Sequence, residues 1–181
     1  MPPVIPASVR RAAPDDVDAL AALAALTFPL ACPPSTSPAD QRAFADAHLS
    51  APRFAGYLED PSRRVLVAPD EGGGLAGYTL LVLGEPYDED AAAAIALRPT
   101  VELSKCYVHP AHHGGGVARA LMAASVAAGC AAGAAGMWLG VNRHNHRAQA
   151  FYAKSGFAVV GTKHFLVGDV LEDDFVMERA L

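Results

Sequence analysis

The stretch His109–Leu121, HPAHHGGGVARAL, places three histidines and three glycines directly before a segment with helical spacing. Imidazoles bind metal ions. A glycine turn that opens a helix binds anions, because the first N–H groups of a helix have no internal partners and the helix dipole is positive there. The stretch therefore suggests three alternatives: a metal site, a phosphate site or an ordinary tight turn.

The metal alternative finds little support in the spacing. Zinc sites need tetrahedral N or S ligands in patterns such as HExxH, and no acidic residue stands at that spacing here. The neighbours His112 and His113 are expected to point apart. Cys32, Cys106 and Cys130 form no CxxC pair. We expect no metal site, and the odd number of widely spaced cysteines fits reduced thiols in a cytoplasm.

The phosphate alternative does not match the two common nucleotide loops. The pattern GxxxxGK[ST] is absent, and Arg119 stands where GxGxxG, counted from Gly114, needs its third glycine. A phosphate chain held as in P-loop or NAD-binding proteins is therefore not expected.

Length and charge narrow the class of protein. The 181 residues suit one domain, 1–181, with a real hydrophobic core. No apolar run reaches the ~18 residues that span a bilayer, and the N-terminal MPPVIPASVRR does not resemble a signal peptide. The net charge of −5 disfavours nucleic acid and mildly favours cationic ligands. We expect a cytoplasmic protein without membrane or nucleic-acid partners.

Hydrophobic periodicity and turn signals predict the order β-α-α-β-β-β-α-β-α-β-β. Hairpins at both ends and a β-α-β crossover in the middle predict a mixed sheet flanked by helices. The predicted strands lie near Val9 and at 65–68, 75–83, 101–108, 137–141, 157–168 and 174–181. The predicted helices begin at Pro14 and span 38–50, 117–129 and 145–156, the last with Asn145 as its N-cap.

Two motifs together resemble the GNAT superfamily of acyl-CoA N-acyltransferases. The family's phosphate loop, (Gln/Arg)-x-x-Gly-x-(Gly/Ala), matches six residues: His113, Gly114, Gly115, Gly116, Val117 and Ala118. Its second motif matches seven: Asn145, Arg147, Ala148, Phe151, Tyr152, Gly156 and Phe157. His113 departs from the usual Arg or Gln, so we expect weakened cofactor binding, with the backbone N–H groups holding most of the pyrophosphate.

The resemblance implies a fold and an activity. The fold is α/β (α+β mixed), with a central mixed, mostly antiparallel sheet of about seven strands flanked by four helices. The activity is direct transfer of an acetyl group from acetyl-CoA to an amine, so Cys106 is not needed as a nucleophile. The chain would be a single N-acetyltransferase domain with a small-molecule amine substrate.

Glu102 and Tyr152 are the catalytic candidates. Alternation along the strand is expected to put Glu102, Ser104 and Cys106 on one face, where Glu102 acts as the base; the alternative is a carboxylate that only positions the cation. Tyr152 shares a helix face with Asn145, seven residues away, and is the proton donor to the thiolate; the alternative is a core tyrosine.

The resemblance also assigns the cofactor contacts. Cys106, Tyr107 and Val108 would pair with the pantetheine arm, and the Val108 N–H would stabilise the oxyanion. Asn145, Ala148 and Tyr152 would line the same arm from the following helix. Trp138 is expected in the core.

The C-terminal HFLVGDVLEDDFVMERAL resembles the PaiA-type spermidine/spermine acetyltransferases, although Val170 and Glu172 depart from that group. Acids expected in surface loops would hold the polycation: Glu85, Asp88, Glu89, Asp90, Asp169, Glu172, Asp173 and Asp174. Peptide or protein amines and amino-sugar antibiotics remain alternative acceptors, and a CoA-binding module without turnover is an alternative of another class. A homodimer is an open expectation.

Overall fold

A computed structural model describes residues 8–181, so most of the N-terminal stretch in which we expect no signal peptide lies outside the described residues. Seven strands form one sheet in the order β1-β2-β3-β4-β5-β7-β6. All neighbouring strands are antiparallel except β4 and β5, which are joined by the crossover helix α5. The predicted mixed, mostly antiparallel α/β fold is confirmed.

The elements follow one another as the periodicity predicts, with differences in number and length. The strands are β1 Arg10–Arg11, β2 Arg63–Pro69, β3 Leu75–Leu83, β4 Thr100–Val108, β5 Gly136–Asn142, β6 Ala158–Val167 and β7 Val170–Ala180. The α-helices are α1 Val17–Ala31, α2 Pro38–His48, α3 Ala51–Glu59, α4 Glu89–Ala94, α5 Val117–Ala131 and α6 His146–Lys154, with 3-10 turns at Pro14–Asp16 and Pro110–His112.

Two short helices, α3 and α4, add to the four expected. The segment expected to be one helix over 38–50 stops at His48, and α3 starts after Ser50 with a proline in its first turn. Asp88 caps α4 by accepting the Ala91 N–H at 2.9 Å. The two helices have only nine and six residues, so each offers no more than two or three turns in which a helical period can be recognised.

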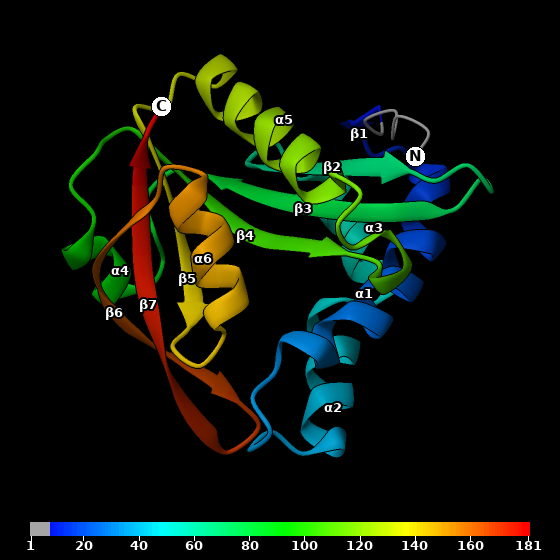
Figure 1. Ribbon diagram of the computed structural model, residues 1–181, viewed down its shortest axis with the longest axis horizontal. Helices are drawn as coiled ribbons and strands as arrows, with labels where there is room; N and C mark the ends of the chain where they lie inside the picture. Colours follow the sequence, from blue (N-terminus) through cyan, green and yellow to red (C-terminus); the bar gives the residue numbers. More distant parts are fainter. Residues whose placement is uncertain (1–7) are drawn as a thin grey trace.

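The helices cover both faces of the sheet (Figure 1). On one face, α5 and α6 pack on a cluster that contains Leu81, Leu103 and Met137. On the other face, α1 and α3 pack on Tyr78 and Leu80. The alternation of Leu80 and Leu81 between the two clusters is the period of two expected of a central strand. Trp138, which is 2% exposed, packs with α4 in the core as predicted.

The last strand starts earlier than predicted. We expected a loop of acidic residues after Gly168 and a strand from Asp174, but β7 begins at Val170. Residues 170–178 pair with β6, so Glu172 and Asp174 lie on one face of a strand and Asp173 on the other. The interpretation of these acids as members of one loop is therefore wrong.

Candidate active site

The cavity that most predicted site residues line, the main cavity of the site, has a volume of about 400 Å³ and opens where β4 and β5 separate. Their pairing ends at Glu102 and Trp138, although β4 continues to Val108 and β5 to Asn142 (Figure 1). Further walls come from α1, α6, β6 and β7. Nine predicted site residues line this cavity: Glu102, Cys106, Tyr107, Val108, His113, Ala118, Asn145, Ala148 and Tyr152.

The separation leaves backbone groups of β4 unpaired on the side of β5. The His109 N–H donates to the Ala76 carbonyl on β3 at 2.8 Å, and Val108 lies opposite Gly77. In an antiparallel ladder, alternate residues point their N–H and C=O groups to opposite sides. Cys106 and Val108 therefore direct their N–H groups away from β3 and into the opening, where an extended ligand can pair with them.

The glycine loop leads directly into α5. Gly114 and Gly116 have φ angles of +78° and +84°, in a region that side chains with a Cβ seldom adopt, and Gly116 is the N-cap of α5. A second cavity of about 620 Å³ adjoins this turn and contacts Gly114, Gly116, Val117 and Ala118, whereas Gly115 lines neither cavity. The loop thus presents the start of a helix to the space that an anion would occupy.

Cationic side chains surround the second cavity. Arg119 from α5 and Arg147, Lys154 and Arg179 line it. Sequence reasoning missed Arg119, Lys154 and Arg179 as residues of this cavity. Arg147 and Lys154 are seven residues apart on α6, and this spacing of two helical turns was a signal that they share a face. The second cavity therefore carries the positive charge that binding of a pyrophosphate and a further phosphate group requires.

His113 takes a different contact from the one its position in the motif suggests. Its Nε2 lies 3.0 Å from the Val108 carbonyl oxygen, which points into the same opening as the Val108 N–H. The imidazole thereby links the glycine loop to the end of β4 and lies between the two cavities.

The residues expected on α6 lie together. Asn145 caps the helix, its Oδ1 accepting the Ala148 N–H at 3.2 Å, as predicted. Ala148 and Tyr152 follow one turn apart along the cavity wall. The Tyr152 ring meets Phe157 edge-on at 6.0 Å. Burial raises the pKa of the Tyr152 phenol well above its ordinary value, so the hydroxyl keeps its proton at neutral pH.

Glu102 lines the cavity, but the predicted set of residues on its face is wrong. Leu80 of β3 pairs with Lys105 and Leu81 pairs with Leu103, so Ser104 is the extra residue of a β-bulge. The bulge reverses the alternation and puts Lys105 and Tyr107 on the Glu102 face. Cys106 lies on the opposite face with the α5 and α6 cluster.

The surroundings shift the pKa values of two side chains on β4. Burial raises the pKa of the Glu102 carboxyl above its ordinary value, and the positive charges of Lys105 and Lys163 act in the opposite direction. Burial raises the pKa of the Cys106 thiol to about 12. Glu102 is therefore moved toward the range in which a base works near neutral pH, whereas Cys106 stays a protonated thiol.

The acids expected to hold a cation divide into two sets. Glu172 and Asp174 line the cavity. Asp173 lies on the other face of β7 and is half exposed, 3.6 Å from the His164 Nε2. Asp88 caps α4 and lies 3.8 Å from the Lys163 Nζ. Four further acids do not line the cavity: Glu85, Glu89, Asp90 and Asp169.

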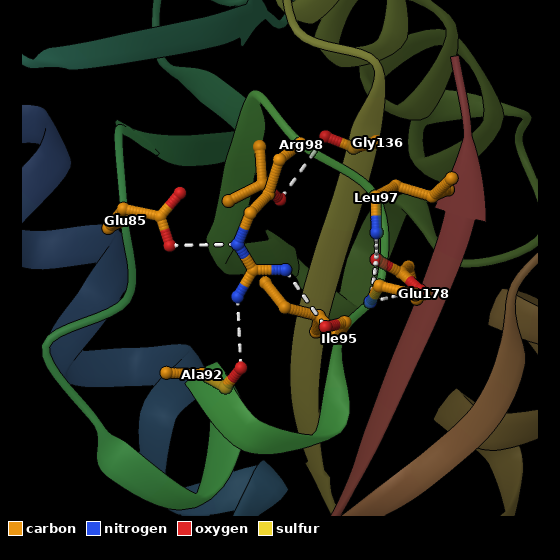
Figure 2. Close-up of polar contacts among 9 residues, drawn as sticks. Glu85, Ala92, Ile95, Leu97, Arg98, Gly136 and Glu178 are labelled. Atoms are coloured by element: carbon orange, nitrogen blue, oxygen red, sulfur yellow. Dashed lines mark hydrogen bonds and ion pairs between the residues drawn. The ribbon is translucent and has the colours of Figure 1, made fainter.

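A polar network anchors the segment that leads into β4 (Figure 2). The Glu178 carboxylate on β7 accepts the Ala96 N–H and the Leu97 N–H, the latter at 2.8 Å. The Arg98 guanidinium donates to the Ala92 and Ile95 carbonyls and pairs with Glu85 at 3.0 Å. These contacts fix the chain four residues before Glu102, so they help to place the carboxylate in the cavity.

Among residues 8–181, no three His, Cys, Asp or Glu side chains gather as a metal site would require. Over the same range, no helix has the length and apolar content needed to cross a membrane.

Known proteins share both the sequence pattern and the fold. The "Acetyltransferase (GNAT) family" model matches residues 24–157. An uncharacterized N-acetyltransferase of Mycobacterium tuberculosis is 48% identical over 166 residues, which are 92% of this chain and 98% of that protein.

Two solved structures share the fold at lower sequence identity. The PaiA N-acetyltransferase of Thermoplasma acidophilum, in complex with coenzyme A, has a TM-score of 0.75 at 19% identity over 98% of this chain and all of the other. The ribosomal-protein-alanine N-acetyltransferase of Brucella melitensis has a TM-score of 0.72 at 22% identity, covering 96% and 99%. With the family match spanning most of the sequence, this chain belongs to the GNAT family of acetyltransferases and is an N-acetyltransferase that uses acetyl-CoA.

Proposed function

We propose that this N-acetyltransferase moves the acetyl group by direct attack onto a primary amine, with polyamines such as spermidine or spermine as the first acceptors. One observation carries the proposal: the opening between β4 and β5 brings unpaired backbone N–H groups, Glu102 and Tyr152 to one cavity. We further propose one catalytic domain over 1–181 in a cytoplasmic protein without membrane or nucleic-acid partners. A homodimer stays a prediction.

The cofactor would lie along both cavities. The loop His113–Ala118 and the start of α5 would hold the pyrophosphate, with Arg119 and Arg147 supplying positive charge. Of the three residues Cys106, Tyr107 and Val108, the first and last would pair with the pantetheine arm through the unpaired side of β4, and Tyr107 lies between them with its backbone groups toward β3. Asn145, Ala148 and Tyr152 would border the arm from α6. His113 would contribute mainly by holding the Val108 carbonyl, a contact that does not depend on the phosphate.

The chain's own residues would then manage the protons and the charge. Glu102 takes the proton of the acceptor ammonium, directly or through water, and so frees the lone pair that forms the new C–N bond. The Val108 N–H stabilises the oxyanion that forms at the carbonyl oxygen. As the C–S bond breaks, the Tyr152 hydroxyl donates its proton to the departing sulfur. Because burial keeps that phenol protonated, the donor is present at neutral pH.

A thiol-release assay with an amine panel tests the proposal. Thiol release from acetyl-CoA should rise when spermidine or spermine is added. Tyr152→Phe should lower kcat by roughly 10²-fold, the usual contribution of a positioned acid, with unchanged acetyl-CoA affinity. Tyr87→Phe is the matched control, because Tyr87 is 92% exposed and lies outside both cavities.

The other outcomes separate the alternatives. Transfer only to peptide amines, or only to amino sugars, would overturn the polyamine acceptor while keeping the enzyme. Tight acetyl-CoA binding with no transfer to any amine would favour the non-catalytic module. A Tyr152→Phe enzyme as fast as the Tyr87→Phe control would remove the phenol from the mechanism.

A further inference from the structure

Asp174 is a buried carboxylate whose Oδ1 has no hydrogen-bond partner among the described residues. The residue is 6% exposed and lines the main cavity. It lies in the middle of β7, opposite Asn142 on β5 and Lys163 on β6. An unpaired buried charge is costly, and most buried charges in proteins are paired. The carboxylate therefore has no partner from the described residues, and the cavity leaves room for a ligand to supply one.

Lys163, which pairs with Asp174 in the sheet register, has its ammonium group near other side chains. Lys163 stands directly across from Asp174, yet its Nζ lies 3.8 Å from the Asp88 Oδ2 and 5.4 Å from the centre of the Phe165 ring. Gly140 lies beside both side chains, and a Cβ there would approach the Lys163 Cε at 2.6 Å and the Asp174 Oδ2 at 3.5 Å. Space next to the carboxylate is thus kept by the absence of a side chain.

The charges on this side of the cavity sum to a negative value. Glu102, Glu172 and Asp174 face it, with Asp88 nearby, against Lys105, Lys163 and Arg63. Lys105 donates to the Ser104 carbonyl and hydroxyl oxygens, and Lys163 is engaged with Asp88. Neither lysine forms an ion pair with Asp174. A ligand that carries a second positively charged group in addition to its reacting nitrogen fits this arrangement.

We propose that Asp174 binds a second ammonium group of the acceptor, which makes the preferred acceptor an alkyl diamine or a longer oligoamine. The inference rests on the proposed acetyl transfer at Glu102. The reacting nitrogen has to lose a proton to attack, whereas the other nitrogen stays charged at neutral pH. A charge-assisted hydrogen bond between that ammonium and the buried carboxylate then selects molecules with two amines over molecules with one.

Steady-state kinetics with matched amines tests the assignment. For the unchanged enzyme, 1,4-diaminobutane should have a KM at least roughly 10-fold below that of butylamine, the effect of one hydrogen bond to a charged group. Asp174→Asn, which keeps the shape, should raise the diamine KM by a similar factor, leave kcat within about 2-fold and hardly change butylamine. Asp173→Asn is the control, because this half-exposed neighbour lies outside the cavity.

Calorimetry distinguishes failure of this inference from failure of acetyl transfer. The CoA-loaded protein should bind 1,4-diaminobutane more tightly than Asp174→Asn does by roughly 10-fold, even if no acetyl group moves. Binding near pH 6 should release more protons in the unchanged protein than in Asp174→Asn, because the ammonium favours the ionised carboxylate.

Some results would overturn the role of Asp174. Equal KM values for the diamine and the monoamine would do so, and so would equal diamine affinity in the unchanged protein and Asp174→Asn. Turnover that is absent with diamine binding intact would instead contradict acetyl transfer to this class of amine.

Discussion

Replacing Asp174 with Asn should stabilise the free protein at neutral pH. The carboxylate is 6% exposed and its Oδ1 has no partner among the described residues. Burial raises the pKa of Asp174 from its ordinary 3.8 to about 6, against the opposing charge of Lys163. Asn has nearly the same shape without the charge, so the substitution removes the desolvation cost and keeps the packing of β7.

The size and the pH dependence of the gain follow from the raised pKa. Each pH unit between the folded and unfolded pKa is worth about 1.36 kcal/mol, so the carboxylate costs about 3 kcal/mol above pH 6. Water in the open cavity shares that cost, and we expect a gain of about 2 kcal/mol in the free energy of unfolding at pH 7.5. Between pH 3.8 and about 6 the folded state binds more protons than the unfolded state, so stability falls as pH rises through this window. At pH 4.5 the gain should therefore shrink below about 1 kcal/mol.

Urea unfolding followed by circular dichroism measures the gain. The unchanged protein, Asp174→Asn and Asp173→Asn would be compared at pH 4.5, 6 and 7.5. The control should stay within about 0.5 kcal/mol, because Asp173 is half exposed and its ion pairs are on the surface. A loss at pH 7.5 would refute the reasoning, since it would show that the carboxylate is stabilised by a partner. A gain that is equal at all three pH values would also refute it, since the gain would then not come from ionisation of the carboxylate.

Three further changes test other parts of the site. Glu102→Gln should lower kcat by roughly 10²-fold or more. In the unchanged enzyme kcat/KM should rise with pH through the raised pKa of Glu102, because the base acts in its deprotonated form. Initial rates measured from pH 5 to 9 that give the same pH profile in both proteins would contradict this role. Gly116→Ala forces a Cβ onto a φ of +84° and should lower the free energy of unfolding by about 1 kcal/mol and weaken acetyl-CoA binding in calorimetry. Gly56→Ala, in the interior of α3 with open space around it, should instead raise the free energy of unfolding by about 0.5–1 kcal/mol and leave acetyl-CoA affinity unchanged. Equal acetyl-CoA affinity in both variants would argue against the loop. Glu178→Ala removes the acceptor of two backbone N–H groups and should cost about 2–3 kcal/mol in urea unfolding, against less than about 1 kcal/mol for Glu85→Ala at the exposed edge of the same network. A loss for Glu178→Ala as small as that for Glu85→Ala would mean that the hydrogen bonds of Glu178 do not stabilise this segment.

Local features of the site could be predicted from the sequence because they depend on neighbours along the chain. The glycine loop, the start of α5 and the Asn145 cap are set by backbone conformation and by contacts within four residues. The succession of helices and strands along the chain and the placement of Ala148 and Tyr152 one turn apart could be predicted in the same way. The family resemblance needed no more than these motifs in their order.

The faces of β4 and β7 could not be predicted in the same way. Alternation puts Glu102 and Cys106 together only if the strand is regular, and the bulge at Ser104 reverses it. A bulge depends on the register against β3, which no neighbouring residue encodes. The start of β7 at Val170 likewise depends on pairing with β6, which turned residues expected in a loop into strand residues with alternating faces.

The sequence alone determined the family and proposed the cofactor loop and the two catalytic candidates, because those signals are carried by residue type and spacing. Only the tertiary structure decided which charges meet. Lys163 faces Asp174 in the register but lies nearer Asp88, which arrives from α4, some 75 residues earlier in the chain. Whether a buried carboxylate has a partner depends on such long-range packing, and this is why Asp174 could not be singled out from the other acids before the fold was known.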